Sequence, residues 1–580
     1  MIERITSNNI KNIQISNPKQ NKNQKSDISF GGVGSSIVKG IQKCEKNPML
    51  NVAVIDLITA IVPRSIIEGF TNIFAGFEAL RREGSGLLIN CLLPGFVALG
   101  IAKLANKSIM GKNADLSNCW ADSKSISTIS DYYTKAETTP AFTEGMQRFN
   151  DAKKAKVYAA HYNMLSDVSG VDGNEIKKFK DITGADIHKT AETLTNATFE
   201  EKPKLSFTQR LSNIFKKKPK SLVKSAYEDL VNKTHIEQNI RIGSGENKIV
   251  TNLESAMQNS TSLMRGFVKD GVESAESMKG FVKKSKNLLK TKSILAMAIV
   301  LPLAASMQFI NRKITSKLSG VTGAPIYEDY AQNKSKTEKT PEEQKQEKEA
   351  LLKQKMISIA SMLSVACLSM MKLPTLSTLK DIVQFKGRFP TMDQARAISA
   401  ITFSSRMAVA DDKNELAEAT TRDLVTFSSM YFLGDYAAKG YATYLEKSKG
   451  VNLLNRTKVL DKKANPLKKF GNWVVNTHLK SSDELVSDGI RSLEEMTHFR
   501  AKCQAANIGS SLLILGLIVP IFTRMKTKKN HEKELMLQDN KDKINIPQNQ
   551  DIHDKIVSSI YDRDFNSTFT AFKQQVKESK

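Results

Sequence analysis

The sequence is poor in the residues that build disulfide frameworks and metal sites. It has 5 cysteines and 7 histidines among 580 residues, with no CxxC pair and no HExxH motif. An odd number of widely spaced cysteines argues against a disulfide scaffold and against a zinc site. Cys91, Cys367 and Cys503 lie in or beside apolar runs, where a thiol behaves as a small apolar side chain. We expect no disulfide, no metal and no cofactor.

Motifs of catalysis and nucleotide binding are also missing. There is no GxSxG elbow, and the stretches GGVGSS and RIGSGENK lack the GK[ST] ending that a P-loop needs. The stretch Asp167–Asp181 carries a glycine like that of an EF-hand loop. In that register, however, Val168 and Gly170 would take ligand positions that need side-chain oxygens. We therefore predict no enzyme activity and assign no catalytic residue.

The N-terminus lacks the continuous apolar segment of a signal peptide. It is rich in Asn, Lys and Ser instead. We expect residues 1–46 to form a disordered polar tail. If the protein enters a membrane, an internal segment must direct it there.

Basic residues, by contrast, are in large excess. The chain has 86 Lys+Arg against 60 Asp+Glu, a formal net charge of +26. Such a surplus favours anionic partners, meaning acidic lipid headgroups or nucleic acid. The basic residues follow no recognisable nucleic-acid-reading motif. We expect a lipid bilayer with anionic lipid as the partner, and no nucleic acid.

The apolar residues gather in four runs without a charge. Three of them, Gly84–Ala102, Ser293–Asn311 and Cys503–Thr523, are 19, 19 and 21 residues long, and the fourth, Met356–Met371, has 16. A helix needs about 20 residues to cross the ~30 Å hydrocarbon core of a bilayer. The three long runs therefore predict membrane spans, and the fourth is short for one. Buried helices of a large soluble α-helical core are the alternative.

Prolines interrupt the three long runs at Pro94, Pro302 and Pro520. An interior proline removes a helix hydrogen bond, which membrane helices tolerate better than soluble ones. These prolines either kink their helices, where they line a cavity or act as hinges, or only reflect the ordinary frequency of proline in membrane spans. We favour the second interpretation. Two of the runs are also alike: GSGLLINCLLPGF begins at Gly84 and GSSLLILGLIVPIF at Gly509. That likeness is either an internal repeat or a coincidence.

A weaker apolar segment, Met49–Leu80, precedes the first long run. Asp56 and Arg64 interrupt it, and Asp56 is the one ionisable residue that we place inside a membrane segment. One helical stripe follows Pro63, formed by Ile66, Phe70, Ile73, Phe77 and Leu80. The stripe suits a helix that lies in the membrane interface or packs on a neighbouring span.

Two basic amphipathic segments are candidates for contact with an anionic membrane surface. In the first, apolar residues are followed by a lysine cluster: Phe207, Leu211, Phe215, Lys216, Lys217 and Lys218. In the second, Phe267 and Phe281 lie fourteen residues apart, almost on the same side of a helix that leads into Ser293. Both patterns fit helices on a bilayer surface. Ordinary packed helices with solvated basic faces are the alternative.

The predicted fold is mainly α, a multi-pass α-helical membrane protein with a large polar helical region between its spans. The predicted regions are a polar tail (1–46), an amphipathic helix and first span (47–112), a polar, basic helical region (113–290), a span (291–312), a charged linker (313–355), a short span with half-buried helices (356–445), a polar helical region (446–502), the last span (503–524) and a basic C-terminal tail with amphipathic helices (525–580).

The distribution of lysine and arginine leaves the number of crossings open. The basic cluster at Arg524–Lys529 predicts a cytoplasmic C-terminus, and the lysines of Lys279–Lys292 predict the same side for the region before Ser293. Both hold only if an even number of crossings separates them. Either Met356–Met371 does not cross, or another segment such as Leu424–Gly434 does.

Three functions fit these features. A non-enzymatic scaffold or membrane-surface organiser that binds anionic lipid explains most of them. A transporter or channel component is the second, although the charge-free runs argue against an ion path through them. A secreted effector or translocator that inserts into a target membrane is the third. Homo- or hetero-oligomers through the spans are compatible with each.

Overall fold

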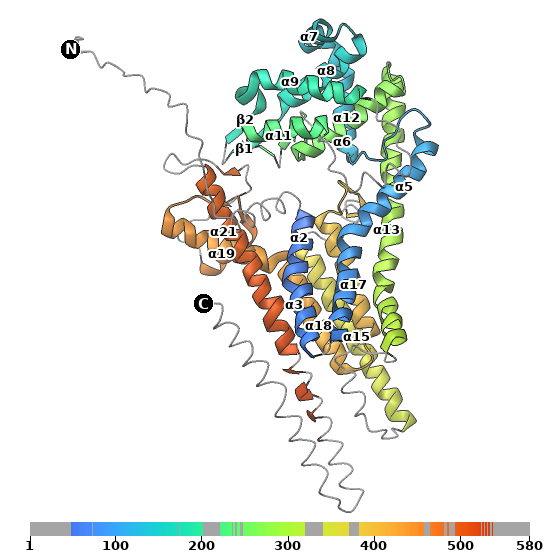
Figure 1. The fold of residues 1–580 in the computed structure, drawn as a ribbon, viewed down its shortest axis with the longest axis vertical. Helices are drawn as coiled ribbons and strands as arrows, with labels where there is room; N and C mark the ends of the chain where they lie inside the picture. Colours follow the sequence, from blue (N-terminus) through green and yellow to red (C-terminus); the bar gives the residue numbers. More distant parts are fainter. Residues whose placement is uncertain are drawn as a thin grey trace, which may run out of the picture.

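Helices dominate the structure, a computed structural model. It describes residues 48–71, 73–172, 175–200, 221–234, 236–237, 240–243, 248–319, 340–370, 382–456, 465–480, 484–485, 493–523, 525–526, 528–530, 532–533 and 536. These residues are mainly helical and include two small antiparallel sheets, which confirms the predicted α class. Figure 1 shows a long helical bundle with a smaller domain against one of its ends.

The bundle begins with a helical hairpin. One arm is α2 (Pro48–Asp56), η1 (Leu57–Ile61) and α3 (Val62–Thr71), and the other is α4 (Ile73–Leu87), η2 (Leu88–Leu92) and α5 (Leu93–Ile109). The arms touch closely, since a Cβ added to Gly76 would lie 2.7 Å from the Cα of Gly69. The predicted single stripe from Ile66 to Leu80 is therefore wrong as one helix, because it is divided between the two arms. Its five side chains all face outward.

The rest of the bundle comes from later in the chain. It consists of α13 (Ala275–Ser319), α15 (Pro341–Met370), α17 (Met392–Val409), α18 (Lys413–Ser428), η6 (Ser429–Leu433), α19 (Gly434–Lys449), α21 (Leu493–Ser511) and η8 (Leu512–Ile518). Among the described residues, five helices are long and apolar enough to cross a membrane: Met49–Phe70, Ile73–Ile109, Ala275–Leu318, Pro341–Met370 and Glu495–Asn530. The short run at Met356 thus belongs to a helix of 30 residues.

Helices α17 and α18 lie inside this bundle although neither contains a long apolar run. Helix α17 packs against both α13 and α15, and its buried face carries hydroxyl groups. Ser399 Oγ lies 2.8 Å from the hydroxyl of Tyr431, and Thr402 Oγ1 donates to Asn90 Oδ1 at 2.9 Å. These polar contacts satisfy the hydroxyls internally. The segment Leu424–Gly434 continues from α18 into η6 beside them.

The outer surface of the bundle is strongly apolar. Phe96 in α5 is 69% exposed, and Leu368 in α15 is 74% exposed. Many more large apolar side chains are exposed on α3, α4, α13 and η8. Soluble monomers rarely expose apolar patches of this extent. The surface favours a membrane environment over the alternative of a large soluble core.

The domain at one end of the bundle is built from the chain between α5 and α13. Its elements are α6 (Ser123–Lys135), η3 (Ala136–Thr138), α7 (Pro140–Phe149), α8 (Ala152–Asp167), β1 (Ser169–Asp172), β2 (Glu175–Lys178), α9 (Phe179–Phe199), α11 (Leu222–Thr234), β3 (Ile240–Ile242), β4 (Ile249–Thr251) and α12 (Leu253–Lys269). The strands form one antiparallel sheet in the order β2-β1-β3-β4. The stretch rejected above as a calcium loop forms the β1–β2 hairpin at its start.

Helix α13 joins this domain to the bundle without a break. Its 45 residues extend about 68 Å. Phe281 and Leu288 lie in the core of the domain, whereas Ala296 and Val300 lie in the core of the bundle. Lys292 sits between them, almost fully buried, with its ammonium 4.2 Å from the Trp120 ring centroid. The junction is therefore packed rather than linked by a loop.

Phe267 and Phe281 are core residues of the domain and not membrane contacts, which corrects the prediction. They are 0% and 2% exposed, and their ring centroids lie 5.0 Å apart. The fourteen-residue spacing does not place them on one helix, because α12 ends at Lys269 and α13 begins at Ala275. The two rings meet between these helices, while lysines such as Lys283 face solvent. The other predicted surface residues, Phe207, Leu211, Phe215 and Lys216–Lys218, lie outside the described residues. The predicted tail of residues 1–46 also lies outside them.

The buried His161 predicts an acid-sensitive domain. Its side chain is 0% exposed, and burial lowers the pKa of the imidazole to about 3. Above pH ~6.5 the ring is neutral in both the folded and unfolded chains. Below that pH the unfolded chain binds a proton that the folded chain does not, so stability falls towards pH 3 at about 1.4 kcal/mol per pH unit. At pH 5 the domain should have lost about 2 kcal/mol relative to pH 7.

Hydrogen exchange of the α8 amides, corrected for the intrinsic effect of pH, measures this loss. The His161→Gln variant should show a flatter profile between pH 7 and pH 5, because its side chain does not titrate. An equally steep profile in the variant would show that another group controls the stability of α8.

Candidate functional site

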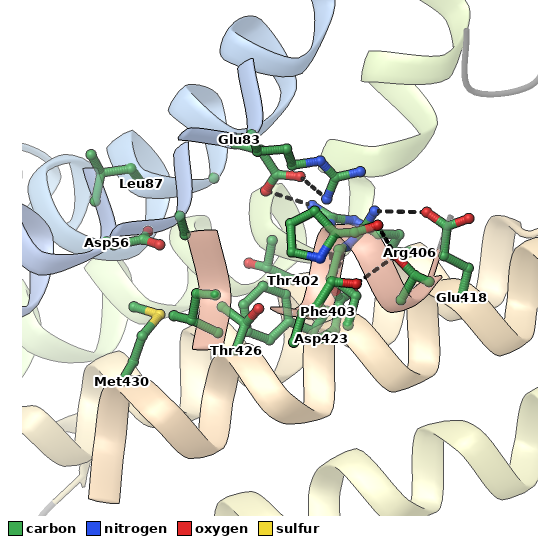
Figure 2. A pocket seen from close by; sticks show the side chains of 18 of the residues that line it. Asp56, Glu83, Leu87, Thr402, Phe403, Arg406, Glu418, Asp423, Thr426 and Met430 are labelled. Carbon is green, nitrogen blue, oxygen red and sulfur yellow. Dashed lines mark hydrogen bonds and ion pairs between the residues drawn. The ribbon is translucent and has the colours of Figure 1, made fainter. Parts of the chain in front are cut away.

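A polar cavity of about 60 Å³ lies inside the bundle. Its lining comes from the first hairpin, the α17–α18 hairpin and the last long helix, and Figure 2 shows its side chains. The charged and polar members of the lining are Asp56, Arg64, Glu68, Glu83, Asn90, Thr402, Arg406, Glu418, Arg422, Asp423, Thr426 and Thr523. A cavity of this size and polarity holds a few water molecules or a small ion.

Arg406 is the centre of a continuous ion-pair network on the cavity wall. Its guanidinium donates to Asp423 Oδ1 at 2.9 Å and to Glu83 Oε2 at 3.2 Å. Glu83 also accepts from Arg64 at 3.2 Å, and Asp423 Oδ1 accepts from Arg422 at 3.1 Å. The network links α3, α4, α17 and α18, as the dashed lines in Figure 2 partly show. It holds together helices that are more than three hundred residues apart in sequence.

The network lies at the end of the apolar runs, and the cavity extends inward from it. Glu83 directly precedes the run Gly84–Ala102, and Thr523 ends the run Cys503–Thr523. Asn90 lies seven residues inward from Glu83, and Asp56 lies eight residues inward from Arg64 of the network, about 11 and 12 Å along the helix axes. The cavity therefore connects a charged rim with the apolar middle of the bundle.

Several buried polar atoms of the cavity have no protein partner. Asp423 Oδ2 and Arg406 Nε are buried and make no hydrogen bond within the described part of the chain. Asp423 is 1% exposed and Arg406 is 6% exposed. In the same part of the chain, no hydrogen bond or ion pair joins the carboxylate of Asp56 to another side chain. Buried polar groups are nearly always satisfied, so these atoms call for water or an ion in the cavity.

Acidic groups outnumber basic ones on the cavity wall. The carboxylates are Asp56, Glu68, Glu83, Glu418 and Asp423, and the guanidinium groups are Arg64, Arg406 and Arg422. The arginines are neutralised within the network, while Asp56 makes no ion pair with them in the described part of the chain. The balance of charge favours a cation over an anion.

Four π-helical segments meet at the cavity. Each supplies one lining residue: Ala60 from η1, Asn90 from η2, Met430 from η6 and Leu515 from η8. In η1, η2 and η8 the segment ends two residues before a proline, namely Pro63, Pro94 and Pro520. A proline has no backbone N–H to donate to a carbonyl of the preceding turn, and a wider π-helical turn is one way to accommodate the missing hydrogen bond. π-Helical turns occur frequently at functional sites.

The three prolines predicted as possible kinks differ in their position relative to the cavity. Pro520 lines the cavity, whereas Pro94 and Pro302 do not belong to the lining. Pro94 is the second residue of α5, in its first turn, and Pro302 lies within the unbroken helix α13. The two similar runs that begin at Gly84 and Gly509 are also alike in structure, since each contains a π-helical segment and each contributes residues to the cavity lining.

The charge-free runs of the sequence do not predict most of the charged residues of the site. They predict no ionisable residue inside the spans apart from Asp56, which does line the cavity. Glu83, Arg406 and Asp423 flank uncharged segments and so fall outside any run defined by the absence of charge. The sequence does contain one signal: the tetrapeptide TFSS occurs at 402–405 and again at 426–429, with Arg406 directly after the first copy and Asp423 three residues before the second.

No protein-family model, curated protein or solved structure matches this chain. Function must then be argued from the site and not from the fold. Within the described residues, no group of three His, Cys, Asp or Glu side chains converges as a metal site. The cavity also joins no nucleophile to a general base. Its chemistry is that of carboxylates, hydroxyls and water, which suits a proton or a monovalent cation.

Proposed function

We propose that this chain is a multi-pass integral membrane protein that works as a transporter or channel component for protons or a monovalent cation. The observation that carries the proposal is the carboxylate of Asp56, which lines a polar cavity between apolar helices without a protein partner. An ionisable group at such a depth is costly to keep and usually marks a path for an ion or substrate. The apolar outer surface and the five span-length helices support the membrane setting.

The site suggests a role for each of its parts. Asp56 binds the cation or proton. The hydroxyl of Thr402 and the amide of Asn90 line the cavity that leads to Asp56. The Arg406 network closes the rim and keeps the four helices in register. The π-helical turns beside Pro63 and Pro520 are positions where small helix movements open or narrow the cavity, as broken helices do in known transporter folds.

The arrangement of the bundle bears on sidedness. Asn530 donates to Asn414 at 3.1 Å, and Arg312 lies 2.8 Å from Glu415. The end of the last helix thus lies beside the far end of α13, opposite the lysines of Lys279–Lys292. If every helix of the bundle crosses, α17 and α18 add crossings and the two basic segments face opposite sides. If the C-terminus is cytoplasmic, the domain lies on the opposite side of the membrane. The cytoplasmic position of the C-terminus remains a prediction.

Replacing Asp56 by asparagine should reduce cation flux about tenfold, because the amide keeps the shape but loses the charge and the titrating proton. The measurement uses the full chain in sealed liposomes with a trapped pH dye, under an imposed potassium diffusion potential. Sodium and potassium uptake are measured on the same vesicles. Asp56→Glu should retain part of the flux because it keeps a carboxylate.

Glu349→Gln is the matched control, since Glu349 is an exposed carboxylate on the polar first half of α15, away from the cavity. It should leave flux unchanged. The proposal fails if the wild-type chain carries no flux above empty liposomes, or if Asp56→Asn and Glu349→Gln behave alike.

The scaffold on anionic lipid is the second candidate, favoured by the net charge of +26. A scaffold should float with liposomes and carry no ion flux. It does not require water in the cavity. A cysteine introduced at Thr402 separates the two candidates. Modification by a small charged thiol reagent from the aqueous phase would support an ion path, whereas complete protection would favour the scaffold.

A further inference from the structure

A short amphipathic helix that packs on α19 has an apolar face that the described protein does not cover. Helix α20 (Pro466–Asn476) presents Leu467, Phe470 and Val475, which are 78%, 63% and 62% exposed. Leu467, Phe470 and Val474 follow the i, i+3, i+7 spacing of one helical face. Lys468 and Lys469 are exposed: Lys468 lies at the edge of this face beside Val475, and Lys469 lies on the opposite, polar side of the helix.

This helix is fixed to the bundle rather than loosely attached. Lys439 in α19 donates to the carbonyls of Val474 at 3.0 Å and Thr477 at 2.9 Å, which satisfies the C-terminal end of α20. The Lys439 ammonium also lies 5.3 Å from the Trp473 ring centroid. Trp473 in turn stacks on Phe470, with centroids 6.2 Å apart, and donates to Thr443 at 3.3 Å.

Two segments next to α20 contact the last long helix near the boundary between its polar and apolar parts. After α20 and β6 (Thr477–Leu479), the carbonyl of Lys480 accepts from Arg500, three residues before the run Cys503–Thr523. On the other side, Tyr436 contacts Trp473 and lies two residues after Gly434, which packs directly on Asn507. Asn507 lies in the first turns of the same run. The helix is thus held at the depth where lipid headgroups would begin.

We propose that α20 is an interfacial anchor that lies in the headgroup layer of the bilayer, with its Leu467, Phe470 and Val475 face among the upper acyl chains and Lys468 and Lys469 on anionic headgroups. An aromatic pair, an apolar face and exposed lysines are the features of such helices. The proposal rests on the bundle spanning a bilayer but not on ion transport. It assigns the lipid contact to a different element from the two segments predicted above.

Tryptophan fluorescence tests the anchor directly, because the chain has only two tryptophans, Trp120 and Trp473. The Trp120→Phe variant leaves Trp473 as the single emitter in the full chain. In liposomes, lipid brominated near the headgroup should quench Trp473 about twofold more than lipid brominated near the chain ends. Adding phosphatidylglycerol to phosphatidylcholine should strengthen the quenching, and the Lys468→Gln, Lys469→Gln pair should abolish that increase.

Two variants separate failure of the anchor from failure of the membrane proposal. Trp473→Phe leaves Trp120, which is 7% exposed inside the protein and should be quenched little by either lipid. Adding Phe96→Trp to the chain without Trp120 and Trp473 places an emitter on the outward face of α5, where deep bromines should quench it. Quenching at position 96 but none at Trp473 overturns the anchor alone. Quenching at neither position overturns the membrane bundle as well.

Discussion

Arg406→Gln is expected to destabilise the bundle by about 3 kcal/mol. The guanidinium is 6% exposed and bridges two carboxylates from different helices, Glu83 and Asp423. Removing one partner of a buried ion pair leaves charge without compensation and costs about 3 to 5 kcal/mol. The lower end of that range applies, since Glu83 keeps Arg64 and Asp423 keeps Arg422. The measurement is denaturation of the purified full chain in detergent, followed by size-exclusion chromatography.

Arg148→Gln provides the matched control. Arg148 also bridges two carboxylates, Glu144 at 2.8 Å and Glu192 at 3.4 Å, but its side chain is 38% exposed. Solvent screens such pairs, so the loss there should be below about 1 kcal/mol. Equal losses at Arg406 and Arg148 would contradict burial as the cause.

A neutralised network distinguishes charge from packing. Combining Arg406→Met with Glu83→Gln removes one charge of each sign and keeps most of the volume, and it leaves the pairs Arg64–Glu68 and Arg422–Asp423 in place. Buried ion pairs replaced in this way often cost little stability. We expect the double variant to be more stable than Arg406→Gln alone. If it is less stable, the contribution of Arg406 is mainly its packing against Phe403 and not its charge.

The sequence predicted the long apolar helices and half-buried helices within 356–445, but it did not predict how α17 and α18 pack between the long helices. Gly84–Ala102, Ser293–Asn311 and Cys503–Thr523 each lie in a span-length helix, as uncharged runs of about 20 residues predict. Helix α17 is shielded by α13 and α15, so its buried face can carry Ser399, Thr402 and Arg406. Such a helix has no hydropathy signal of its own.

Most residues of the site could not be predicted from the sequence, for a related reason. Asp56 was visible because it interrupts an apolar segment, whereas Glu83, Arg406 and Asp423 appear as ordinary polar residues between segments. Only the pairing of helices distant in sequence shows that these charges face one another and not water. The misplacement of Phe267 and Phe281 has the opposite origin, since an amphipathic pattern does not say whether its apolar face covers protein or lipid.

Gly95→Ala is expected to disrupt the contact between α5 and the segment before α17. A Cβ at Gly95 would lie 1.7 Å from the carbonyl oxygen of Arg388 and 2.9 Å from its carbonyl carbon. Because the obstacle is backbone and not the end of a side chain, no rotamer change relieves it, and the cost should reach about 3 kcal/mol, the upper end for overpacking. The same segment carries Phe385, whose amide donates to Ser293 at 3.2 Å and whose ring lies 6.4 Å from that of Trp120.

The displacement should therefore reach the junction between the bundle and the domain. We expect a lower unfolding temperature in detergent, together with a shift of Trp120 emission in a Trp473→Phe background, as the cover over the indole moves. Gly100→Ala is the matched control on the same helix, since an added Cβ there meets nothing within 4 Å. Alanine is the better helix former, so Gly100→Ala should leave the unfolding temperature unchanged or raise it slightly. A Gly95→Ala protein as stable as Gly100→Ala would show that α5 does not pack on this segment.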